Sequence, residues 1–359
     1  MVVPSQQPRR RAARLAAAAC ALLLVACQSP SEGAGGQEGT LKLAFSYAST
    51  SQNPFQEMAF GAQAAAADAG EVELTANAPS SIDGPAQVSQ FQSAIRTSAD
   101  GIALQTLTPD LFVRPLRQAK DADVPVVAVD TVPPEGTDVG LYVGNSNTEL
   151  GRELGRELLK HIPEDAEGYV VLGNDIPGLA LLEQRLAGTR EVLEQERPGV
   201  SIRGPFDAGS EPSVNFNKWN DIVKAHPDAI AYIGAGASDA VSLALIQKNT
   251  GRRFLVGSCD PDPQALRGVK EGYVAALASP EHWLKGYVAV RMLAQSARTG
   301  EPLPQGWWNT GSLIINSENI DEIMARQANE ASRKEWFAEE AAAQVADPQA
   351  HMRPLTEAN

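Results

Sequence analysis

The sequence is poor in the residues from which many catalytic and metal sites are built. Its 359 residues include three cysteines and four histidines. They form no Cys/His cluster with the spacing of a transition-metal site, and no acidic segment has the spacing of an EF-hand loop. None of the histidines stands in a recognisable catalytic triad. We therefore expect no metal, no cofactor and no hydrolase chemistry.

A dinucleotide-dependent enzyme has little support for a similar reason. One Gly-rich turn follows an expected strand, namely Gly234-Ala235-Gly236-Ala237-Ser238-Asp239. This turn lacks the third glycine of the dinucleotide-binding fingerprint and lies in the second half of the chain. We expect a binding protein and keep a secreted enzyme only as an alternative.

Positive charge and long apolar runs are also scarce. The chain carries 44 acidic residues against 30 basic ones, which gives a formal net charge of −14. A protein that binds nucleic acid needs a basic face to replace counterions along the phosphate backbone, so we expect no nucleic-acid partner. Beyond residue 26, no apolar run is long enough to cross a bilayer.

The first 26 residues have the features of a lipoprotein signal peptide. Four arginines between positions 9 and 14 precede the apolar run 15–26, which ends at Cys27. The segment Leu24-Val25-Ala26-Cys27 is similar to the lipobox at which bacterial lipoproteins are lipidated and cleaved. We expect Cys27 to become a lipidated N-terminus; an ordinary signal peptide and a short anchor helix are the alternatives. The export route, Sec or twin-arginine, stays open.

The Gly- and Ser-rich segment 27–40 is a predicted flexible tether. If Cys20 is removed and Cys27 is lipidated, Cys259 is the only thiol of the folded body, so no internal disulfide can form. Loss of the four arginines of the signal would change the formal charge from −14 to −18. We therefore expect a body tethered by lipid at the outer face of the cytoplasmic membrane or located in the periplasm.

From residue 41 onward, short apolar or β-branched runs alternate with longer segments of helical periodicity. Such alternation is typical of parallel sheets with helices on both faces, and the remaining ~320 residues fit two domains better than one. The expected strands are 41–47, 72–76, 101–105, 126–130, 141–143, 169–172, 201–206, 229–234, 254–257, 273–277 and 308–315. The expected helices are 55–69, 88–95, 111–119, 148–161, 181–195, 214–225, 239–247, 263–270 and 283–296, before a charged tail, 318–359, that we expect to be helical or disordered.

Several segments, taken in order, resemble the ribose-type periplasmic binding proteins, which share their fold with the effector domain of lac-type repressors. They are Gln52-Asn53-Pro54-Phe55, Pro125 to Asp130, Gly144 to Gly151, Arg185-Leu186-Ala187-Gly188, Gly257-Ser258-Cys259-Asp260 and Ser279-Pro280. The resemblance implies an α/β fold with two doubly wound parallel-sheet lobes, joined by three crossings, and a cleft between them. It assigns 41–145 and 279–300 to the N-terminal lobe, and 146–278 and 301–317 to the C-terminal lobe.

The resemblance also implies a sugar-binding cleft at the carboxyl ends of the strands. Asn53, Asp130, Arg185 and Asp260 would hydrogen-bond to the sugar, and Phe55 would cover the face of its ring. Asp130 and Asp260 each follow an apolar run directly, so each carboxylate must be exposed in a cleft or paired.

Asp239, in the loop after the expected strand 229–234, is a further candidate for sugar binding. Helix capping is the alternative role for Asn53 and Asp239, because Asn and Asp are favoured N-cap residues. For Arg185 the alternative is a surface position on an amphipathic helix.

The chain departs from the family pattern at three positions of the expected pocket. Gln56 stands where many members have a second aromatic residue, Thr131 where many have Arg, and Ala278 where Gln is common. The pocket is therefore not a copy of a ribose site, and the identity of the sugar stays open. Three aromatic residues could replace the missing wall, although a tryptophan at helical spacing is more often in a core: Trp283, Trp219 and Tyr47.

We predict an extracytoplasmic solute-binding lipoprotein that takes a monosaccharide or a similar small polyol and delivers it to the permease of an ABC importer. A monomer is expected. The alternative is a sensory binding protein that presents a sugar or a signalling molecule to a membrane receptor. A repressor is not expected, because a signal peptide stands where a helix-turn-helix domain would be.

Overall fold

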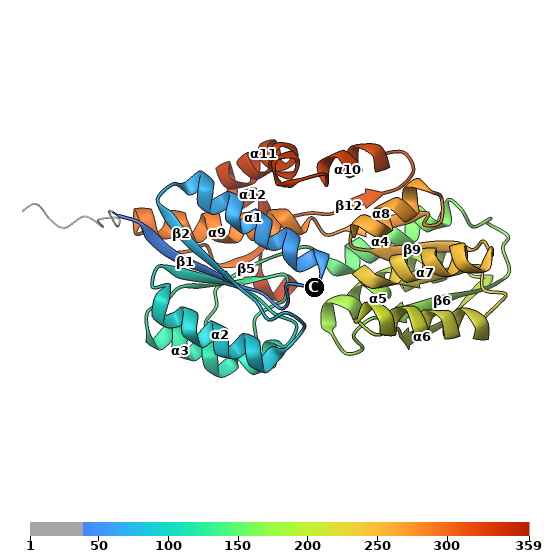
Figure 1. The fold of residues 1–359 in the computed structure, drawn as a ribbon, viewed down its shortest axis with the longest axis horizontal. Helices are drawn as coiled ribbons and strands as arrows, with labels where there is room; N and C mark the ends of the chain where they lie inside the picture. The colour runs from blue at the N-terminus through green and yellow to red at the C-terminus, as the bar shows by residue number, and fades with distance from the viewer. Residues whose placement is uncertain (1–38, 359) are drawn as a thin grey trace, which may run out of the picture. The chain divides into compact units, whose positions relative to one another are not determined.

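The computed structural model describes residues 39–358, which form two α/β lobes (Figure 1). The expected signal peptide, 1–26, and Cys27 lie outside these residues, as does most of the tether 27–40. Within the described part of the chain, no helix is both long enough and apolar enough to cross a membrane. The predicted α/β fold with two doubly wound sheets is confirmed.

The N-terminal lobe is built on a seven-stranded sheet that is parallel except for its last strand. On one face, Leu43 and Phe45 pack under α1 (Asn53–Ala69) and α9 (His282–Thr299). On the other face, Ala44 packs toward α2 (Gly84–Thr97), η1 (Pro109–Phe112) and α3 (Val113–Asp121). Both faces are covered, which explains why its strands are nearly continuous apolar runs. The strand order is β13 (Met352–Arg353), β11 (Gly306–Asn309), β5 (Leu141–Gly144), β4 (Val126–Val129), β3 (Gly101–Gln105), β1 (Leu41–Ser46) and β2 (Val72–Asn77).

The C-terminal lobe repeats this plan with a six-stranded sheet, in which only β12 runs antiparallel to its neighbour. Helices α4 (Asn147–Leu159) and α5 (Ala180–Glu196) cover one face of the sheet. Helices α6 (Pro212–Ala225), α7 (Ala237–Thr250) and α8 (Pro263–Lys270) cover the other. The strand order is β12 (Leu313–Ile315), β10 (Ala276–Ser279), β9 (Leu255–Cys259), β8 (Ala231–Gly234), β6 (Gly168–Asn174) and β7 (Val200–Asp207).

In each lobe, one pair of helices meets through glycines. A Cβ atom on Gly61 of α1 or on Gly286 of α9 would lie 1.9 Å from a backbone oxygen of the opposite helix. In the second lobe, a Cβ on Gly151 of α4 or Gly188 of α5 would lie 1.9 Å and 2.0 Å from such an oxygen. Only glycine allows the two helix backbones to approach so closely.

The chain passes between the lobes after β5, after β10 and, for the third time, after β11, about ten residues later than the expected boundary at 300–301. Residues 301–317 were assigned to the C-terminal lobe, with one strand at 308–315. Instead, β11 pairs with β5 in the first sheet, and only β12 pairs with β10 in the second. Gly311, with φ +83°, lies in the connection where the chain leaves one sheet for the other.

The tail after residue 317 is ordered and makes a fourth crossing. Helix α10 (Ile320–Arg326) packs on the core of the C-terminal lobe, and α11 (Glu330–Ala346) packs on the N-terminal lobe. The chain ends with α12 (Pro348–His351), β13 and η2 (Leu355–Glu357). At the crossing, Arg326 is buried and its Nη1 lies 3.1 Å from Oε2 of Glu281, which stands in the second connection between the lobes.

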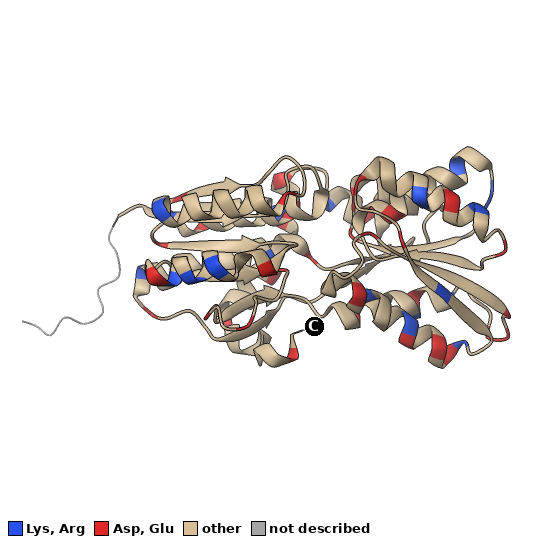
Figure 2. Ribbon diagram, turned by 90° about the horizontal axis from the view of Figure 1, so that it is seen from below, with Lys and Arg blue, Asp and Glu red and all other residues tan. Residues whose placement is uncertain are grey.

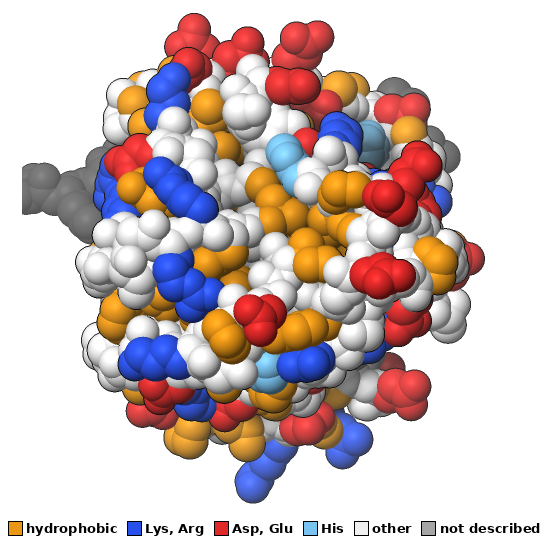
Figure 3. Space-filling model, turned by 90° about the vertical axis from the view of Figure 1, so that its right-hand side faces the viewer, with side chains coloured by type: hydrophobic (Ala, Val, Ile, Leu, Met, Phe, Trp, Pro, Cys, Tyr) orange, Lys and Arg blue, Asp and Glu red, His pale blue; other side chains and the backbone are white. Residues whose placement is uncertain are grey.

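The other expected elements lie within a few residues of the observed ones. The strand expected at 273–277 begins instead at Ala276, because the amides of Tyr273 and Val274 close a turn by donating to the carbonyl of Gly268. Charged residues lie mainly in the helices and loops, as Figure 2 shows. Figure 3 shows acidic and basic side chains interspersed on one end of the molecule.

Candidate functional site

Asp130 and Asp260 occupy equivalent places in the two lobes. Each directly follows a strand, β4 or β9, and is 4% exposed. Each adopts a left-handed backbone conformation, with φ +64° and +68°, which Asp tolerates better than most residues. Their amides still donate to the neighbouring strand, at 2.8 Å to Val143 and 2.9 Å to Ala278. The two predicted carboxylates are thus fixed at the carboxyl ends of their sheets.

Asp130 is paired with a lysine that the sequence analysis did not single out. Lys285 of α9 is fully buried, and its Nζ lies 2.5 Å from Oδ1 of Asp130. Burial opposes ionisation of Asp130, but Lys285 and His282 outweigh it and hold the pKa of Asp130 below its usual range. Burial also lowers the pKa of Lys285, and Asp130 opposes that shift. A charged pair therefore stands at the base of the site.

Asp260 has two basic partners. Arg185 of α5 places Nη1 3.1 Å from Oδ2, and His282 places Nε2 2.8 Å from Oδ1. Burial opposes ionisation here too, yet Arg185 and His282 hold the pKa of Asp260 well below its usual range. Arg185 also donates from Nε to Asn147 and from Nη1 to the carbonyl of Ala235. The surface alternative for Arg185 is wrong, because its side chain is buried in this network.

His282 lies between the two carboxylates. Its Nε2 contacts Asp260, and its Nδ1 is 3.9 Å from Oδ1 of Asp130. Nδ1 has no hydrogen-bond partner among the described residues. His282 begins α9, directly after a connection between the lobes, so it is hydrogen-bonded to the carboxylate of one lobe and lies near that of the other.

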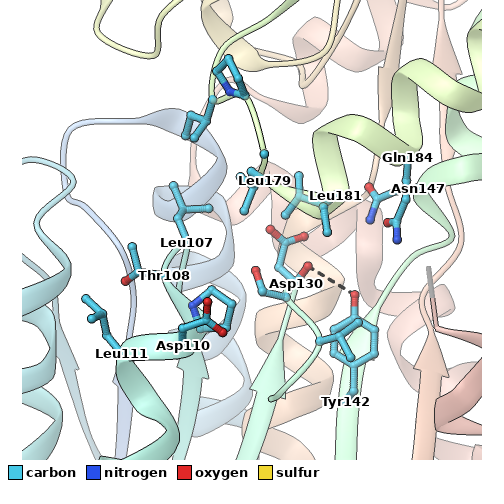
Figure 4. A pocket seen from close by; sticks show the side chains of 17 residues that line it. Leu107, Thr108, Asp110, Leu111, Asp130, Tyr142, Asn147, Leu179, Leu181 and Gln184 are labelled. Atoms are coloured by element: carbon cyan, nitrogen blue, oxygen red, sulfur yellow. Dashed lines mark hydrogen bonds between the residues drawn. The ribbon is translucent and has the colours of Figure 1, made fainter. Parts of the chain in front are cut away.

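Two neighbouring cavities adjoin these groups. The smaller, of about 50 Å³, is lined by Asp130, Asp260, Arg185 and His282 together with Phe55 and the apolar loop between β6 and α5. The larger, of about 590 Å³, shares Asp130 and is shown in Figure 4. There, side chains that follow β3 face side chains of the loop after β6 and the start of α5. Its labelled lining residues are Leu107, Thr108, Asp110, Leu111, Asp130, Tyr142, Asn147, Leu179, Leu181 and Gln184.

Phe55 and Asn53 both lie at the start of α1, beside this site. Phe55 is buried in the core of the first lobe and lines the smaller cavity, a position that suits the predicted wall. Asn53 lines a separate cavity nearby, and its buried Oδ1 has no partner among the described residues. The capping role considered for Asn53 is absent, since Gln52 is the N-cap and makes no side-chain cap bond.

Asp239 is occupied by structural contacts. It is fully buried and accepts hydrogen bonds from Asn215 Nδ2 at 2.8 Å, Trp219 Nε1 at 2.6 Å and the Gly236 amide at 3.1 Å. It caps α7 and lines neither cavity beside Asp130. The geometry therefore favours the capping role over contact with a ligand.

The three residues that depart from the family pattern are accommodated within the lobes, two of them through hydrogen bonds to nearby carbonyl groups. Thr131 Oγ1 donates to the carbonyl of Thr106 at 2.6 Å, and Gln56 Nε2 to that of Thr50 at 2.7 Å. Ala278 is buried within β10. None of the three aromatic candidates for a second wall lines a cavity beside Asp130, and each packs in a core instead: Trp283, Trp219 and Tyr47. Ile176 and Leu179 of the β6–α5 loop, with Leu181 and Leu182 of α5, line the smaller cavity together with Phe55.

Comparison with known proteins places the chain among binding proteins. A family model described as a periplasmic binding protein domain matches residues 43–302. A xylose/arabinose-binding protein of Sulfolobus acidocaldarius is 23% identical over 269 residues, which cover 70% of this chain. The match spans 65% of the length of that relative.

Solved structures of binding proteins have the same fold. A glucose-galactose binding protein from Geobacillus stearothermophilus is 25% identical, with a TM-score of 0.70, over 79% of this chain and 99% of that one. A solute-binding protein from Burkholderia graminis in complex with D-arabinose is 20% identical, with a TM-score of 0.72, over 79% and 98%. A periplasmic ribose ABC transporter protein from Conexibacter woesei is 22% identical, with a TM-score of 0.70, over 81% and 96%.

Proposed function

The chain belongs to the periplasmic binding protein family, and on that premise we propose that it binds a monosaccharide or similar small polyol for an ABC importer. One observation carries the proposal. Asp130 and Asp260, from different lobes, line one small cavity together with Phe55. Two carboxylates accept hydrogen bonds from hydroxyls held at fixed angles, and an aromatic ring covers C–H groups, so the set suits a sugar.

The charges of the site support an uncharged solute. Lys285 neutralises Asp130, and Arg185 neutralises Asp260, so the two ion pairs balance. An acidic or basic solute would bring an unpaired charge into a buried site, at a large cost in free energy. A neutral polyol brings none, and each carboxylate keeps lone pairs free to accept its hydroxyls.

Ligand binding is proposed to close the lobes. A sugar that bonds to Asp130 and Asp260 at once contacts both lobes, so it favours the closed state by the difference in its contacts between the two states. Small-angle scattering with and without a bound sugar tests this step. An unchanged radius of gyration at saturation would contradict it.

Calorimetric titration tests the sugar site itself. Asp130→Ala and Asp260→Ala each remove a charged acceptor, and hydrogen bonds to charged groups contribute roughly 1.5–3 kcal/mol. Affinity for a sugar that the wild type binds should fall at least about tenfold for each variant, since 1.4 kcal/mol corresponds to a factor of ten. Asp221→Ala, at an exposed acid of the C-terminal lobe, is the control and should bind normally.

Melting curves of the unliganded variants separate binding from folding. If the two carboxylates serve only the fold, melting temperatures drop and the folded fraction still binds with wild-type affinity. That result would place the pocket elsewhere.

Lipid tethering through Cys27 completes the proposal. Cys27 lies outside the described residues, so its support is the order of charge, apolar run, small residue and cysteine in the sequence. Metabolic labelling with a palmitate analogue should label the wild type, and Cys27→Ser should release the protein from the membrane fraction. Wild-type protein without label would contradict this part.

A further inference from the structure

Asp175 is a buried carboxyl group beside the site that the proposed function does not use. It follows β6 in the C-terminal lobe and lines the smaller cavity with Asp260, Arg185 and His282. Its side chain is 8% exposed, and Oδ1 has no hydrogen-bond partner among the described residues. A buried acceptor without a partner costs free energy, so a native structure rarely keeps one unless something else bonds to it.

The surroundings of Asp175 determine where its proton lies. The carboxyl groups of Asp175 and Asp239 both lie against Gly236: a Cβ atom there would lie 2.3 Å from Oδ2 of Asp175, and the Gly236 amide donates to Oδ2 of Asp239 at 3.1 Å. Asp239 already accepts hydrogen bonds from Asn215, Trp219 and the Gly236 amide, so donors already occupy both of its oxygens. Two carboxyl groups can share a hydrogen bond only if one of them carries the proton. That group is Asp175, because Asp239 has the donors.

The backbone is shaped to hold this pair. A Cβ atom on Gly236 would lie 2.3 Å from Oδ2 of Asp175, so a side chain there would displace the carboxyl group. The Gly236 carbonyl is fixed by Ser258 Oγ at 3.0 Å, and the preceding carbonyl, of Ala235, by Arg185 at 2.9 Å. The loop that carries the acceptor of the Asp175 proton is therefore tied to Arg185, a residue of the site.

We propose that Asp175 is a third carboxyl group of the sugar site and that it acts in its uncharged form. Its hydroxyl donates to Asp239, and its carbonyl oxygen, Oδ1, accepts a hydrogen bond from a hydroxyl of the bound sugar. The proposal rests on the sugar-binding function. It divides the carboxyl groups of the site into two ionised acceptors, Asp130 and Asp260, and one neutral acceptor.

The charged groups around Asp175 give the proposal a pH dependence. Asp239 of α7 and Asp260 after β9 face it, and Arg185 of α5 and His282 of α9 line the same cavity. Burial first, and then repulsion by Asp239 and Asp260, raise the pKa of Asp175 well above its usual range. The folded state therefore loses stability as the pH rises through that pKa, because the unfolded chain ionises at lower pH without penalty.

Two substitutions at this position separate a neutral acceptor from a charged one. Asp175→Asn keeps a carbonyl oxygen in place of Oδ1 and an N–H donor to Asp239, so it copies the uncharged acid. Asp175→Ala removes both groups. The probes are D-xylose, L-arabinose, D-arabinose, D-ribose, D-glucose and D-galactose, titrated calorimetrically into the full-length protein at pH 7.

For any of these sugars that the wild type binds, Asp175→Asn should stay within about twofold of wild-type affinity. Asp175→Ala should bind about fivefold more weakly, the loss of one neutral hydrogen bond. Asp260→Asn, which removes the charge opposite Arg185 and His282, should lose at least about tenfold. In urea unfolding, the wild type should lose stability as the pH rises above about 4, the usual pKa of an aspartate, and Asp175→Asn should not show this loss.

Three results would overturn the proposal in different ways. Wild-type affinity in Asp175→Ala means that the residue does not contact the sugar. Equal loss in Asp175→Asn and Asp175→Ala means that the ionised form binds. If the stability of the wild type changes with pH no more than that of Asp175→Asn, then Asp175 and Asp239 do not share a proton. If the wild type binds none of the six sugars, the sugar-binding function itself fails, which is a separate result.

Discussion

The two halves of the site are built alike from unrelated segments of the chain. In each lobe a strand ends in an aspartate with left-handed backbone, and a helix supplies the basic side chain that neutralises it: Asp130 with Lys285, and Asp260 with Arg185. In each lobe the basic residue lies on a helix that meets a second helix through glycines. Each basic residue thus lies on a helix that is in close backbone contact with a second helix of its own lobe.

The halves differ in how firmly the cation is held. Arg185 bonds to Asn147, to the carbonyl of Ala235 and to Asp260, so the guanidinium ties three segments of its lobe together. Lys285 is a compact point charge whose side-chain bond is to Asp130. The first half therefore depends on one ion pair, while the second is a network. Substitutions can test whether this difference matters.

Loss of the single pair should have the largest effect. Lys285→Met leaves the carboxylate of Asp130 buried without its main partner, and breaking a buried pair in this way costs about 3–5 kcal/mol. Urea unfolding should show this loss, and the double variant Lys285→Met/Asp130→Asn should recover much of it.

Lys120→Met is the matched control for that experiment, because Lys120 pairs with Asp138 on the surface. Its effect should be far smaller, since exposed ion pairs contribute little. If Lys285→Met and Lys120→Met lose the same free energy of unfolding, the Lys285–Asp130 pair does not stabilise the first half of the site.

The helix contacts should show that the two lobes are equally intolerant of an added methyl group. Gly151→Ala and Gly286→Ala each place Cβ 1.9 Å from a backbone oxygen, and overpacking of this kind costs about 1–3 kcal/mol or more. Gly155→Ala is the control one turn away on α4, where the nearest contact is the Cβ atom of Val192 at 3.1 Å. In thermal unfolding, Gly155→Ala should lower the melting temperature far less than either Gly151→Ala or Gly286→Ala. A large effect in only one lobe would break the comparison.

Acid should affect the second half more than the first. Asp130 and Asp260 both have lowered pKa values in the folded state, so each contributes stability that is present above its usual pKa and lost as the pH falls through the folded value. Asp260 has two basic partners, so its share should be larger. As the pH falls below about 4, the usual pKa of an aspartate, toward the lower folded values, the stability of Asp260→Asn should therefore fall less steeply than that of Asp130→Asn. If stability falls equally steeply with pH in the two variants, the two halves do not differ in their sensitivity to acid.

The smallest effect is expected from a substitution that places the same residue before the aspartate in both halves of the site. Cys259 precedes Asp260, and Val129 precedes Asp130; both are fully buried. Burial raises the pKa of the Cys259 thiol to about 12, so it acts as a small apolar group. Cys259→Val should change the free energy of unfolding by less than about 1.5 kcal/mol and leave sugar affinity unchanged. A loss of affinity would give the thiol a role that packing alone does not explain.

Local sequence patterns predicted the strands and the aspartates at their ends, because an apolar run followed by Asp is visible in a few adjacent residues. The partners of these aspartates were not predictable in the same way. Lys285 is 155 positions from Asp130 in the sequence. Nothing in the residues around it on α9 distinguishes it from an ordinary exposed lysine of an amphipathic helix. Asp175 likewise carries no local signal, since its pKa is raised by burial and by Asp239 of α7, which is distant in the sequence.

The lobe boundary and the tail could not be derived for a related reason. The three residues 310–312 decide that β11 joins one sheet and β12 the other, and both strands are short apolar segments that fit either sheet. The charged, Ala-rich composition of 318–359 predicted a helix, but not its docking. Phe337 of α11 stacks on Trp283 with ring centroids 5.0 Å apart, a contact that composition does not reveal.

The docked tail has a consequence for the order in which the protein folds. Arg333 bonds to Glu57 across 276 positions of sequence, and β13 completes the edge of the first sheet only at Met352 and Arg353. Most of the second lobe, by contrast, comes from the continuous stretch 147–279. During synthesis the N-terminal lobe is thus the first to emerge and the last to be complete. Until residue 353 has emerged, one edge of its sheet and the side of Trp283 stay open, which exposes a nascent chain to aggregation.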